Sequence, residues 1–360
     1  MQSGLKVVVF AFVGLFGAIQ QPAPAVALGD PERVGTGCNI SMSRKLALPT
    51  LVDVPDAYTA NAPEPVTTAM KGWAEYMMRL ASRAAVSSSA RNQFKDELLA
   101  VAQKDAMQFP KGWEKGNHRP PSTIYHTMET LFPAMVGYAR YKSSFSESEQ
   151  ELVQSWAQRI IDRLGRTKKM QNWKYDNKKY QYGALMAVYG YSAEDGSYLK
   201  KAERIYTTAI KGMREDGSLK GDSGRGGSAL HYTSLALANL TAIAEFAALS
   251  GRNLYDYQSR GKSLHLGIQF LVKATSNPEL IAGYANTEGW QEGSFAGYTP
   301  TNQDRRWASG PAAMWGYTYF ARYGSTASGQ NLRKISPFLA SGRGGVHQQS
   351  GGNSLCFVGK

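Results

Sequence analysis

The sequence predicts an all-α protein whose helices come in consecutive pairs. Apolar residues recur at spacings of three and four over most of residues 67–322, which is the helical period, whereas strand signals are sparse. Segments that are apolar nearly all round also alternate with amphipathic ones. An inner helix is buried on every side and an outer helix on one side only. We therefore expect an α/α toroid, or incomplete α/α barrel, whose inner-helix ends surround a cleft.

The chain begins with features of a cleavable signal peptide. Lys6 precedes an apolar run from Val7 to Ile19, and Ala25-Val26-Ala27 then forms a small-x-small cleavage site. The run is shorter than the roughly 20 residues of a membrane span. We expect residues 1–27 to be removed and the protein to be periplasmic or secreted, without stable membrane insertion. Residues 28–360 suffice for one large domain, expected to be a monomer.

Several segments follow the helical period. The first of them has apolar residues at spacings of three and four, namely Met70, Trp73, Met77 and Leu80. A capping-box pattern, formed by Ser146 and Glu149, precedes the segment Glu151–Leu164. The expected helices are Thr67–Ala85, Asn92–Ala106, Thr123–Tyr141 (kinked or divided by Pro133), Glu151–Leu164, Gln181–Tyr191, Ser197–Met213, Ser228–Ser250, Tyr255–Thr275 and Arg305–Arg322.

Three segments lack the helical period. Residues 28–65 are rich in Pro, Gly and Ala and are expected to be an extended arm. Gln108–Ser122 contains Gly, Pro and basic residues, so we expect a loop that either contacts a ligand or is a solvated connection. Ser341–Lys360 is a Gly- and Ser-rich tail with short extended segments.

The two cysteines lie near the two ends of the mature chain. In an oxidising compartment Cys38 and Cys356 are expected to form a disulfide, which would bring these ends together. Two isolated cysteines and five scattered histidines offer no metal-ligand spacing. We expect neither a metal nor another cofactor.

A net charge of +13 favours anionic partners: nucleic acid, anionic lipid or acidic polysaccharide. The sequence contains no basic run of five or more residues, and an exported protein rarely meets nucleic acid. We therefore expect an acidic polysaccharide as the partner and no nucleic acid.

Polar and basic residues are concentrated between Asn172 and Tyr232. This stretch opens with NWKYDNKKYQYG and closes with GRGGSALHYTS, and it supplies amides, cations, phenols and an imidazole. Such residues can bind a carboxylate, stabilise a developing negative charge and move a proton.

These residue types suit β-elimination on a uronic acid polymer. The enzyme must neutralise the sugar carboxylate, remove the C5 proton, stabilise the enolate-like intermediate and protonate the departing O4. Amides and cations supply the electrostatic part, and a tyrosine beside cations can serve as base and then as acid. The candidate catalytic residues are Asn177, Lys178, Tyr180, Arg225, His231 and Tyr232.

Helical geometry relates the second half of this set. Arg225 and Tyr232 are about two turns apart and can share one face of the helix that begins near Gly226. His231 lies about 100° from Tyr232 around the same helix. The alternative is structural: Tyr232 would cap a core and Arg225 would be a surface cation.

Asp216–Tyr257 resembles the corresponding region of the alginate lyase family with the α/α toroid fold, in which a DG turn leads through an arginine-containing loop into an A-L-x-Y helix. Upstream, DNKKYQ (Asp176–Gln181) is similar to that family's Asn-Asn-His-x-Tyr-Trp motif, and WQEGS (Trp290–Ser294) to its Trp-x-Glu-Pro segment. The resemblance covers roughly residues 172–292. It implies the toroid fold and polyuronate lyase activity.

The resemblance assigns roles and also shows departures. It makes Asn177 the carboxylate-neutralising asparagine, and Lys178 stands where the family has its catalytic histidine. The family's arginine and tyrosine are seven residues apart, as Arg225 and Tyr232 are. An ungapped alignment through the helix would place Ser228 and Leu235 there instead, so the assignment needs a shift of one turn. These departures indicate a divergent relative of the family, with alginate, glucuronan or another polyuronate as its expected substrate.

Further residues are candidates for substrate binding. Each can equally serve packing or surface pairing: an aromatic ring can stack on a sugar, a cation can hold a carboxylate, and a carboxylate can orient a cation. They are Tyr125, His126, Trp290, Glu292, Arg305 and Arg306.

Two other functions remain open. A glycoside hydrolase on the same scaffold would use Asp176 and Glu292 as its carboxylate pair and give hydrated reducing ends. A non-catalytic periplasmic polyuronate-binding protein would hold the polymer without cleaving it, which the lysine at position 178 favours.

Overall fold

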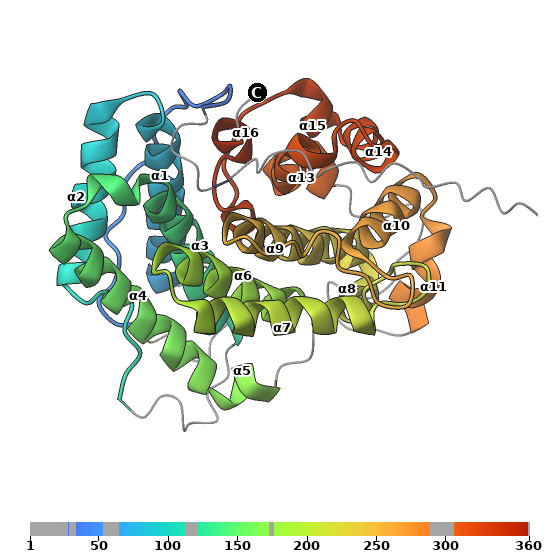
Figure 1. The fold of residues 1–360 in the computed structure, drawn as a ribbon, viewed down its shortest axis with the longest axis horizontal. Coiled ribbons are helices and arrows are strands. Elements are labelled where there is room, and N and C mark those ends of the chain that lie inside the picture. The colour runs from blue at the N-terminus through green and yellow to red at the C-terminus, as the bar shows by residue number, and fades with distance from the viewer. Residues whose placement is uncertain are drawn as a thin grey trace, which may run out of the picture.

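The computed structural model describes residues 28, 34–52, 65–111, 121–172, 176–287 and 306–358. Its helices form an arc that runs through the whole described chain (Figure 1). The helices that pack against one another along the inside of the arc are α1, α3, α6, α9 and α13, and their outer partners are α2, α4, α7, α10 and α14. This arrangement is an α/α toroid, as the sequence predicts.

The bounds of the main helices mostly agree with those expected from periodicity. They are α1 Pro65–Ala84, α2 Ser88–Gln103, α3 Pro121–Tyr141, α4 Glu147–Arg166, α6 Asn177–Ser192, α7 Gly196–Gly212, α9 Ala229–Leu249, α10 Leu264–Ser276, α13 Trp315–Tyr323 and α14 Ala327–Ile335. Pro133 lies inside α3, which continues through it as one helix.

Burial separates the inner helices from the outer ones. Nearly every residue of α6 and of α9 is buried, whereas α7 buries one side only. Within the described residues, Gly226–Leu249 alone is long and apolar enough to cross a membrane by composition, and 83% of its most apolar window is buried inside the protein. That burial identifies α9 as the central helix of the hydrophobic core.

Two expected helices are wrong in extent. Tyr255–Thr275 begins only at Leu264, because Arg260 and Gly261 take the left-handed backbone conformation and Ser263 caps α10. Arg305–Arg322 is divided at Gly310-Pro311 into α12 (Arg306–Ser309), a 3₁₀ turn and α13. A proline has no backbone N–H to continue the helical hydrogen bonds.

Several short elements were not expected. They are α5 (Lys168–Asn172), α8 (Lys220–Ser223), α11 (Glu279–Thr287), α14, α15 (Pro337–Ser341) and α16 (Ser354–Phe357). The tail thus contains the helical turns η6 (Gln348–Ser350) and α16 as well as the isolated bridge between His347 and Gly352. Residues 34–52, the described part of the expected arm apart from Leu28, contain no helix.

The two ends of the chain meet beside α1. The predicted disulfide joins Cys38 to Cys356, 318 residues apart in sequence, and Arg140 at the end of α3 donates a hydrogen bond to the carbonyl of Phe357. The C-terminal segment thus lies against the inner helices, and Figure 1 shows α16 beside α1 at the open side of the arc. This contact holds the 3₁₀ turn η6 (Gln348–Ser350) against α3 and α9.

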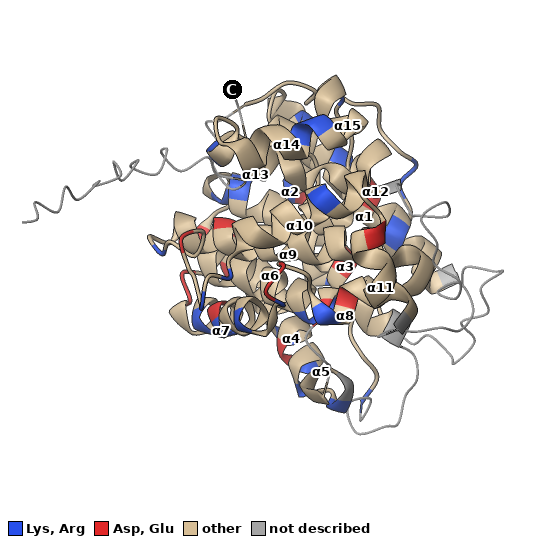
Figure 2. Ribbon diagram, turned by 90° about the vertical axis from the view of Figure 1, so that its right-hand side faces the viewer, with Lys and Arg blue, Asp and Glu red and all other residues tan. Residues whose placement is uncertain are grey.

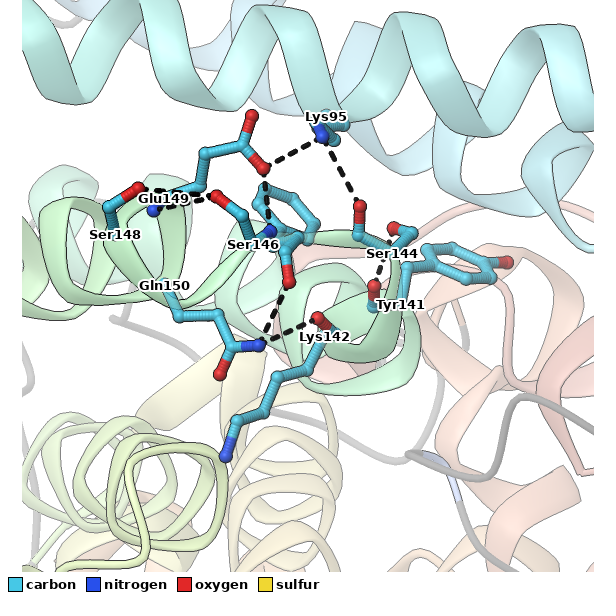
Figure 3. Close-up of polar contacts among 9 residues, drawn as sticks. Lys95, Tyr141, Lys142, Ser144, Ser146, Ser148, Glu149 and Gln150 are labelled. Atoms are coloured by element: carbon cyan, nitrogen blue, oxygen red, sulfur yellow. Dashed lines mark hydrogen bonds and ion pairs between the residues drawn. The ribbon is translucent and has the colours of Figure 1, made fainter.

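The connection from α3 to α4 illustrates how local sequence sets an element boundary (Figure 3). Ser146 and Glu149 form the predicted capping box, in which each side chain bonds the other's backbone N–H. Lys95 of α2 lies 2.7 Å from Glu149 and donates to the Ser144 carbonyl. The boundary that orients α4 is thereby fixed to the first helical pair.

Candidate active site

The N-terminal ends of three inner helices lie together at one opening of the toroid, which is called the end of the ring below. Residues 125–129 of α3, 176–178 at the start of α6 and 225–232 at the start of α9 contact one another and the 3₁₀ turn η6. Helix N-termini present unpaired backbone N–H groups and the positive end of the helix dipole. This end of the ring therefore favours an anionic ligand before any side-chain charge is considered.

Two aspartates hold the first turn of α6. Asp176 caps the helix by accepting hydrogen bonds from the backbone N–H groups of Lys178 and Lys179. Asp222, which is fully buried, accepts from the backbone N–H of Asn177 at 3.0 Å. Burial, together with the charge of Asp176, raises the pKa of the Asp222 carboxyl well above its usual value. These contacts fix the position of Asn177.

The side-chain amide of Asn177 is buried and unpaired. Its Oδ1 and Nδ2 make no hydrogen bond within the described part of the chain, while its backbone carbonyl accepts one from Asn239 of α9 at 3.0 Å. A buried amide left without partners costs on the order of 1–3 kcal/mol. Because Asn177 is fully buried, a polymer reaches it only after local opening of the chain around it. A carboxylate would supply the acceptor that Nδ2 lacks.

Arg225 and Tyr232 contact each other at the start of α9. The Arg225 guanidinium carbon lies 4.6 Å from the centroid of the Tyr232 ring, and Nη2 lies 3.7 Å from an Asp176 carboxylate oxygen. Arg225 is almost fully buried, while Tyr232 is partly exposed. His231 lies next to Tyr232, with ring centroids 5.6 Å apart. A cation beside a partly accessible phenol can stabilise negative charge on its oxygen.

Lys178 and Tyr125 connect α6 to α3. The Lys178 ammonium lies 5.9 Å from the centroid of the Tyr125 ring. The Tyr125 hydroxyl accepts a 2.6 Å hydrogen bond from the Gln349 amide. Burial raises the pKa of Tyr125 well above its usual value, and the nearby Glu129 and Tyr232 add to the shift. Tyr125 therefore remains a protonated phenol at neutral pH.

Gln349 of η6 ties together three inner helices. Its amide nitrogen also lies 3.5 Å from Glu129 of α3, and its oxygen accepts from Asn239, which in turn holds the Asn177 carbonyl. Gln349 is almost fully buried. A continuous hydrogen-bonded chain thus runs from the C-terminal segment to Tyr125 and to the backbone of Asn177.

A histidine and a carboxylate complete the wall on α3. His126 Nδ1 lies 3.0 Å from Glu129, and the ring of His126 packs 5.5 Å from that of Tyr125. Burial raises the pKa of Glu129, but the hydrogen bond and charge of His126 outweigh it, so the pKa lies below its usual value.

Burial lowers the pKa of His347 to about 4, helped by the nearby His231. His347 is therefore neutral at physiological pH.

The structure brings together most of the residues singled out in the sequence. Asn177, Lys178, Arg225, His231, Tyr232, Tyr125 and His126 all lie at this end of the ring. Tyr180 is 2% exposed and packs in the hydrophobic core. Trp290, Glu292 and Arg305 lie outside the described residues, and of Arg306 only its place at the start of α12 is described.

Sequence reasoning missed four polar residues of the site. Glu129 and Asn239 lie within helices read as apolar or amphipathic, and Asp222 lies in a Gly-rich turn. Gln349 comes from the tail, more than one hundred residues from the other site residues in sequence. The one available sequence signal for such residues is a polar residue inside an otherwise apolar helix, because a buried polar group is expected to be hydrogen-bonded. Asn239 is the residue to which this signal applies.

The described residues contain no cluster of three His, Cys, Asp or Glu side chains that could hold a metal ion. What the site offers is an amide, two cations, phenols and imidazoles. Fold and site together define an α/α-toroid protein whose inner-helix ends suit a carboxylate-bearing ligand.

Comparison with known proteins makes this class more specific. Residues 122–281 match the family model described as alginate lyase. A polysaccharide lyase of Stenotrophomonas maltophilia is 34% identical over 103 residues, which cover 28% of this chain and about 30% of that protein. Residues 122–281 are thus similar to the alginate lyase family.

Solved structures show the same fold. Alginate lyase A1-III from Sphingomonas species A1 has a TM-score of 0.70 at 19% identity, covering 94% of this chain and 91% of that one. The same enzyme complexed with a tetrasaccharide gives 0.69, over 94% and 90%. An alginate lyase from Bacteroides ovatus gives 0.52 at 13% identity, over 88% and 86%.

Proposed function

We propose that the protein is a polysaccharide lyase that cleaves a uronate polymer by β-elimination. The observation that carries the proposal is the contact of the Arg225 guanidinium with the Tyr232 ring, 4.6 Å from its centroid, beside the start of α6. It joins a fixed cation to a partly exposed phenol at the end of the ring where Asn177 and Lys178 also lie. The match of residues 122–281 to the alginate lyase family model supports the reaction class.

In this proposal the sugar carboxylate binds between the start of α6 and Arg225. The Asn177 amide donates to one carboxylate oxygen, and Lys178 and Arg225 balance its charge. As the C5 proton leaves, negative charge spreads onto the carboxylate, and the same groups stabilise it more strongly than in the ground state. Lys178 thus fulfils the electrostatic role at the position where the family resemblance places a histidine.

Tyr232 is the proposed proton carrier. Its phenolate oxygen removes the C5 proton, the C4–O4 bond breaks, a C4=C5 double bond forms, and the phenol returns the proton to O4. Arg225 stabilises the phenolate by its charge. Tyr125 stays protonated at neutral pH because its pKa is raised, so it offers no phenolate, and Tyr180 is enclosed in the core.

One side chain can serve as base and acid only if the C5 proton and O4 lie on the same face of the sugar. Mannuronate and glucuronate have this arrangement in their ordinary chair, whereas guluronate is inverted at C5. The proposed substrates are therefore polymannuronate, including mannuronate blocks of alginate, and glucuronan. Polyguluronate is expected to react far more slowly.

The test compares two tyrosine variants. Tyr232→Phe should reduce turnover of polymannuronate by at least about a thousandfold while polymer binding changes little, because only the proton carrier is removed. Tyr180→Phe, the matched loss of a buried hydroxyl, should retain most of the turnover. If Tyr232→Phe remains active, the assignment of the proton carrier is wrong.

The alternative of a glycoside hydrolase finds less support. The oxygens of Asp176 already cap α6 and face Arg225, so this carboxylate has a structural role. The proposed partner Glu292 lies outside the described residues. A non-catalytic polyuronate-binding protein would bind polymannuronate but give no unsaturated product.

We also propose export, with cleavage after Ala27 and release as a monomer to the periplasm or beyond. Leu28, the first residue after that bond, is buried, and its carbonyl lies 3.5 Å from Nη1 of Arg140. Amino-terminal sequencing of protein from the periplasm or medium should give Leu-Gly-Asp. An intact leader on the exported protein would contradict this proposal.

A further inference from the structure

A groove on the outer side of the ring is lined by basic side chains and is separate from the residues discussed above. It lies between α4 and α5 on one side and α7 on the other, over the first turns of α6, with a volume of about 680 Å³. Figure 2 shows Lys and Arg positions along α5 and α7 at this edge of the molecule. A volume of this size falls within the range of ligand-binding pockets.

Helical spacing explains why cations gather in this groove. Lys201, Arg204, Thr208 and Lys211 follow one another at three, four and three residues along α7, so they occupy one exposed face of it. Arg166, at the end of α4, lines the same groove. A single helix face thus supplies three cations, and the neighbouring helix supplies a fourth.

Lys179 adds a fifth cation that is held in place. Its ammonium donates a 2.7 Å hydrogen bond to the carbonyl of Met170 in α5. It is two residues beyond Asn177, or about 200° around α6, so it points away from the amide of the active site. Burial lowers the pKa of this amine. An anion bound in the groove would offset the cost of that burial.

These cations lack the carboxylate partners that are common elsewhere on the surface. Within the described residues, none of the five lies within 4.0 Å of a carboxylate oxygen. Cations on other faces do have such partners; the pairs are Lys45–Glu97, Arg79–Glu75, Lys95–Glu149, Lys142–Glu194, Arg159–Asp105, Arg252–Glu203 and Lys262–Glu215.

The chemistry of the lining narrows the class of ligand. The acidic residue in the lining, Asp162, accepts a 2.5 Å hydrogen bond from the Tyr198 hydroxyl. Tyr182, Met186 and Ile205 add apolar surface to the lining. A lining with both cations and apolar side chains suits a chain of sugar rings that carry carboxylates, since each ring has an apolar face and a charged edge.

We propose that this groove is a second binding site for anionic polysaccharide, on the other side of α6 from the catalytic residues. The assignment of the polymer as a uronate rests on the proposed function, whereas the site itself rests on the groove and its five cations, none of which has a carboxylate oxygen within 4.0 Å among the described residues. Its effect is to hold a long polymer on the protein, so it should matter for polymers and not for short oligosaccharides.

The test uses a triple variant, Lys201→Gln, Arg204→Gln and Lys211→Gln. A charge-matched control carries Lys104→Gln, Lys273→Gln and Lys334→Gln, which alter exposed lysines directly after α2, in α10 and in α14. Binding to polymannuronate is measured in a Tyr232→Phe background, where the polymer stays intact, with neutral dextran as the comparison polymer.

We expect the triple variant to bind polymannuronate roughly tenfold more weakly than the control, because it loses three exposed ion pairs with the polymer. With Tyr232 intact, its KM for the polymer should rise while its turnover of a mannuronate tetrasaccharide remains unchanged. Equal binding by the triple variant and the control would overturn the proposal. If no variant gives unsaturated product but the binding difference persists, the groove stands and the lyase assignment fails.

Discussion

Replacing Gln349 tests whether the C-terminal segment positions the active site. In Gln349→Leu the Tyr125 hydroxyl loses its 2.6 Å donor and the Asn239 amide loses an acceptor at 3.3 Å. Both remaining groups are in buried surroundings but keep another partner, Asn177 for the Asn239 amide and Glu129 for the Tyr125 hydroxyl, so each lost hydrogen bond costs about 1 kcal/mol. The variant should therefore lower the free energy of unfolding by about 2 kcal/mol.

The catalytic effect follows from the same two contacts. Without Gln349, the link from Tyr125 to Asn239 is broken, and Tyr125 is free to move relative to Lys178 and Tyr232. The loss of one net hydrogen bond of about 1 kcal/mol in the transition state corresponds to a fall in kcat/KM of roughly fivefold to tenfold. Initial rates of unsaturated-product formation on polymannuronate, together with thermal melting, measure both effects.

Two further variants make the result interpretable. Gln348→Leu alters the neighbouring, partly exposed side chain and should leave both quantities nearly unchanged. Gln349→Glu introduces a carboxylate beside Glu129, whose negative charge raises the pKa of the new group. Its protonated form can still donate to Tyr125, so stability and activity relative to wild type should improve as pH falls. If Gln349→Leu behaves like Gln348→Leu, the positioning role is refuted.

Three other predictions concern stability. Burial lowers the pKa of His347 to about 4 from an ordinary value near 6.5, so between these pH values the unfolded chain binds a proton that the folded chain does not. The free energy of unfolding should therefore fall as pH drops from about 6.5 toward 4. His347→Gln should flatten this part of a pH–stability curve. Arg322→Met leaves Glu245 buried with only part of its hydrogen bonding, so it should lower the free energy of unfolding by about 3–5 kcal/mol in chemical denaturation. Much of this loss should be recovered when Glu245→Met is added. An unchanged denaturation midpoint in the single variant would show the pair to be dispensable. Replacing Cys38 and Cys356 by Ser should cost about 2–5 kcal/mol, and a melting temperature equal to that of the wild type would contradict the stabilising role of the disulfide.

The fold could be predicted because periodicity and burial agree along most of the chain. Apolar-all-round segments became the inner helices α6 and α9, and the amphipathic segment became the outer helix α7. The errors occurred where backbone geometry overrides periodicity. Arg260 and Gly261 take left-handed conformations before α10, and Pro311 divides the last predicted helix.

The candidate site was predictable where residues are close in sequence and not where they meet only in space. Asn177, Lys178, Arg225 and Tyr232 lie at the starts of two adjacent inner helices, which sequence spacing indicates. Gln349 reaches the same place because the disulfide and the turn around Gly351 hold the tail against α3. No local sequence pattern encodes that contact.

The central claim is that this end of the ring performs β-elimination on a uronate polymer. The most direct measurement is ultraviolet absorbance while the mature protein is incubated separately with polymannuronate, glucuronan and polyguluronate. We expect rising absorbance from unsaturated uronate with polymannuronate or glucuronan, and little with polyguluronate. New reducing ends without that absorbance would indicate hydrolysis, and no change with any of the three polymers would contradict the proposed activity.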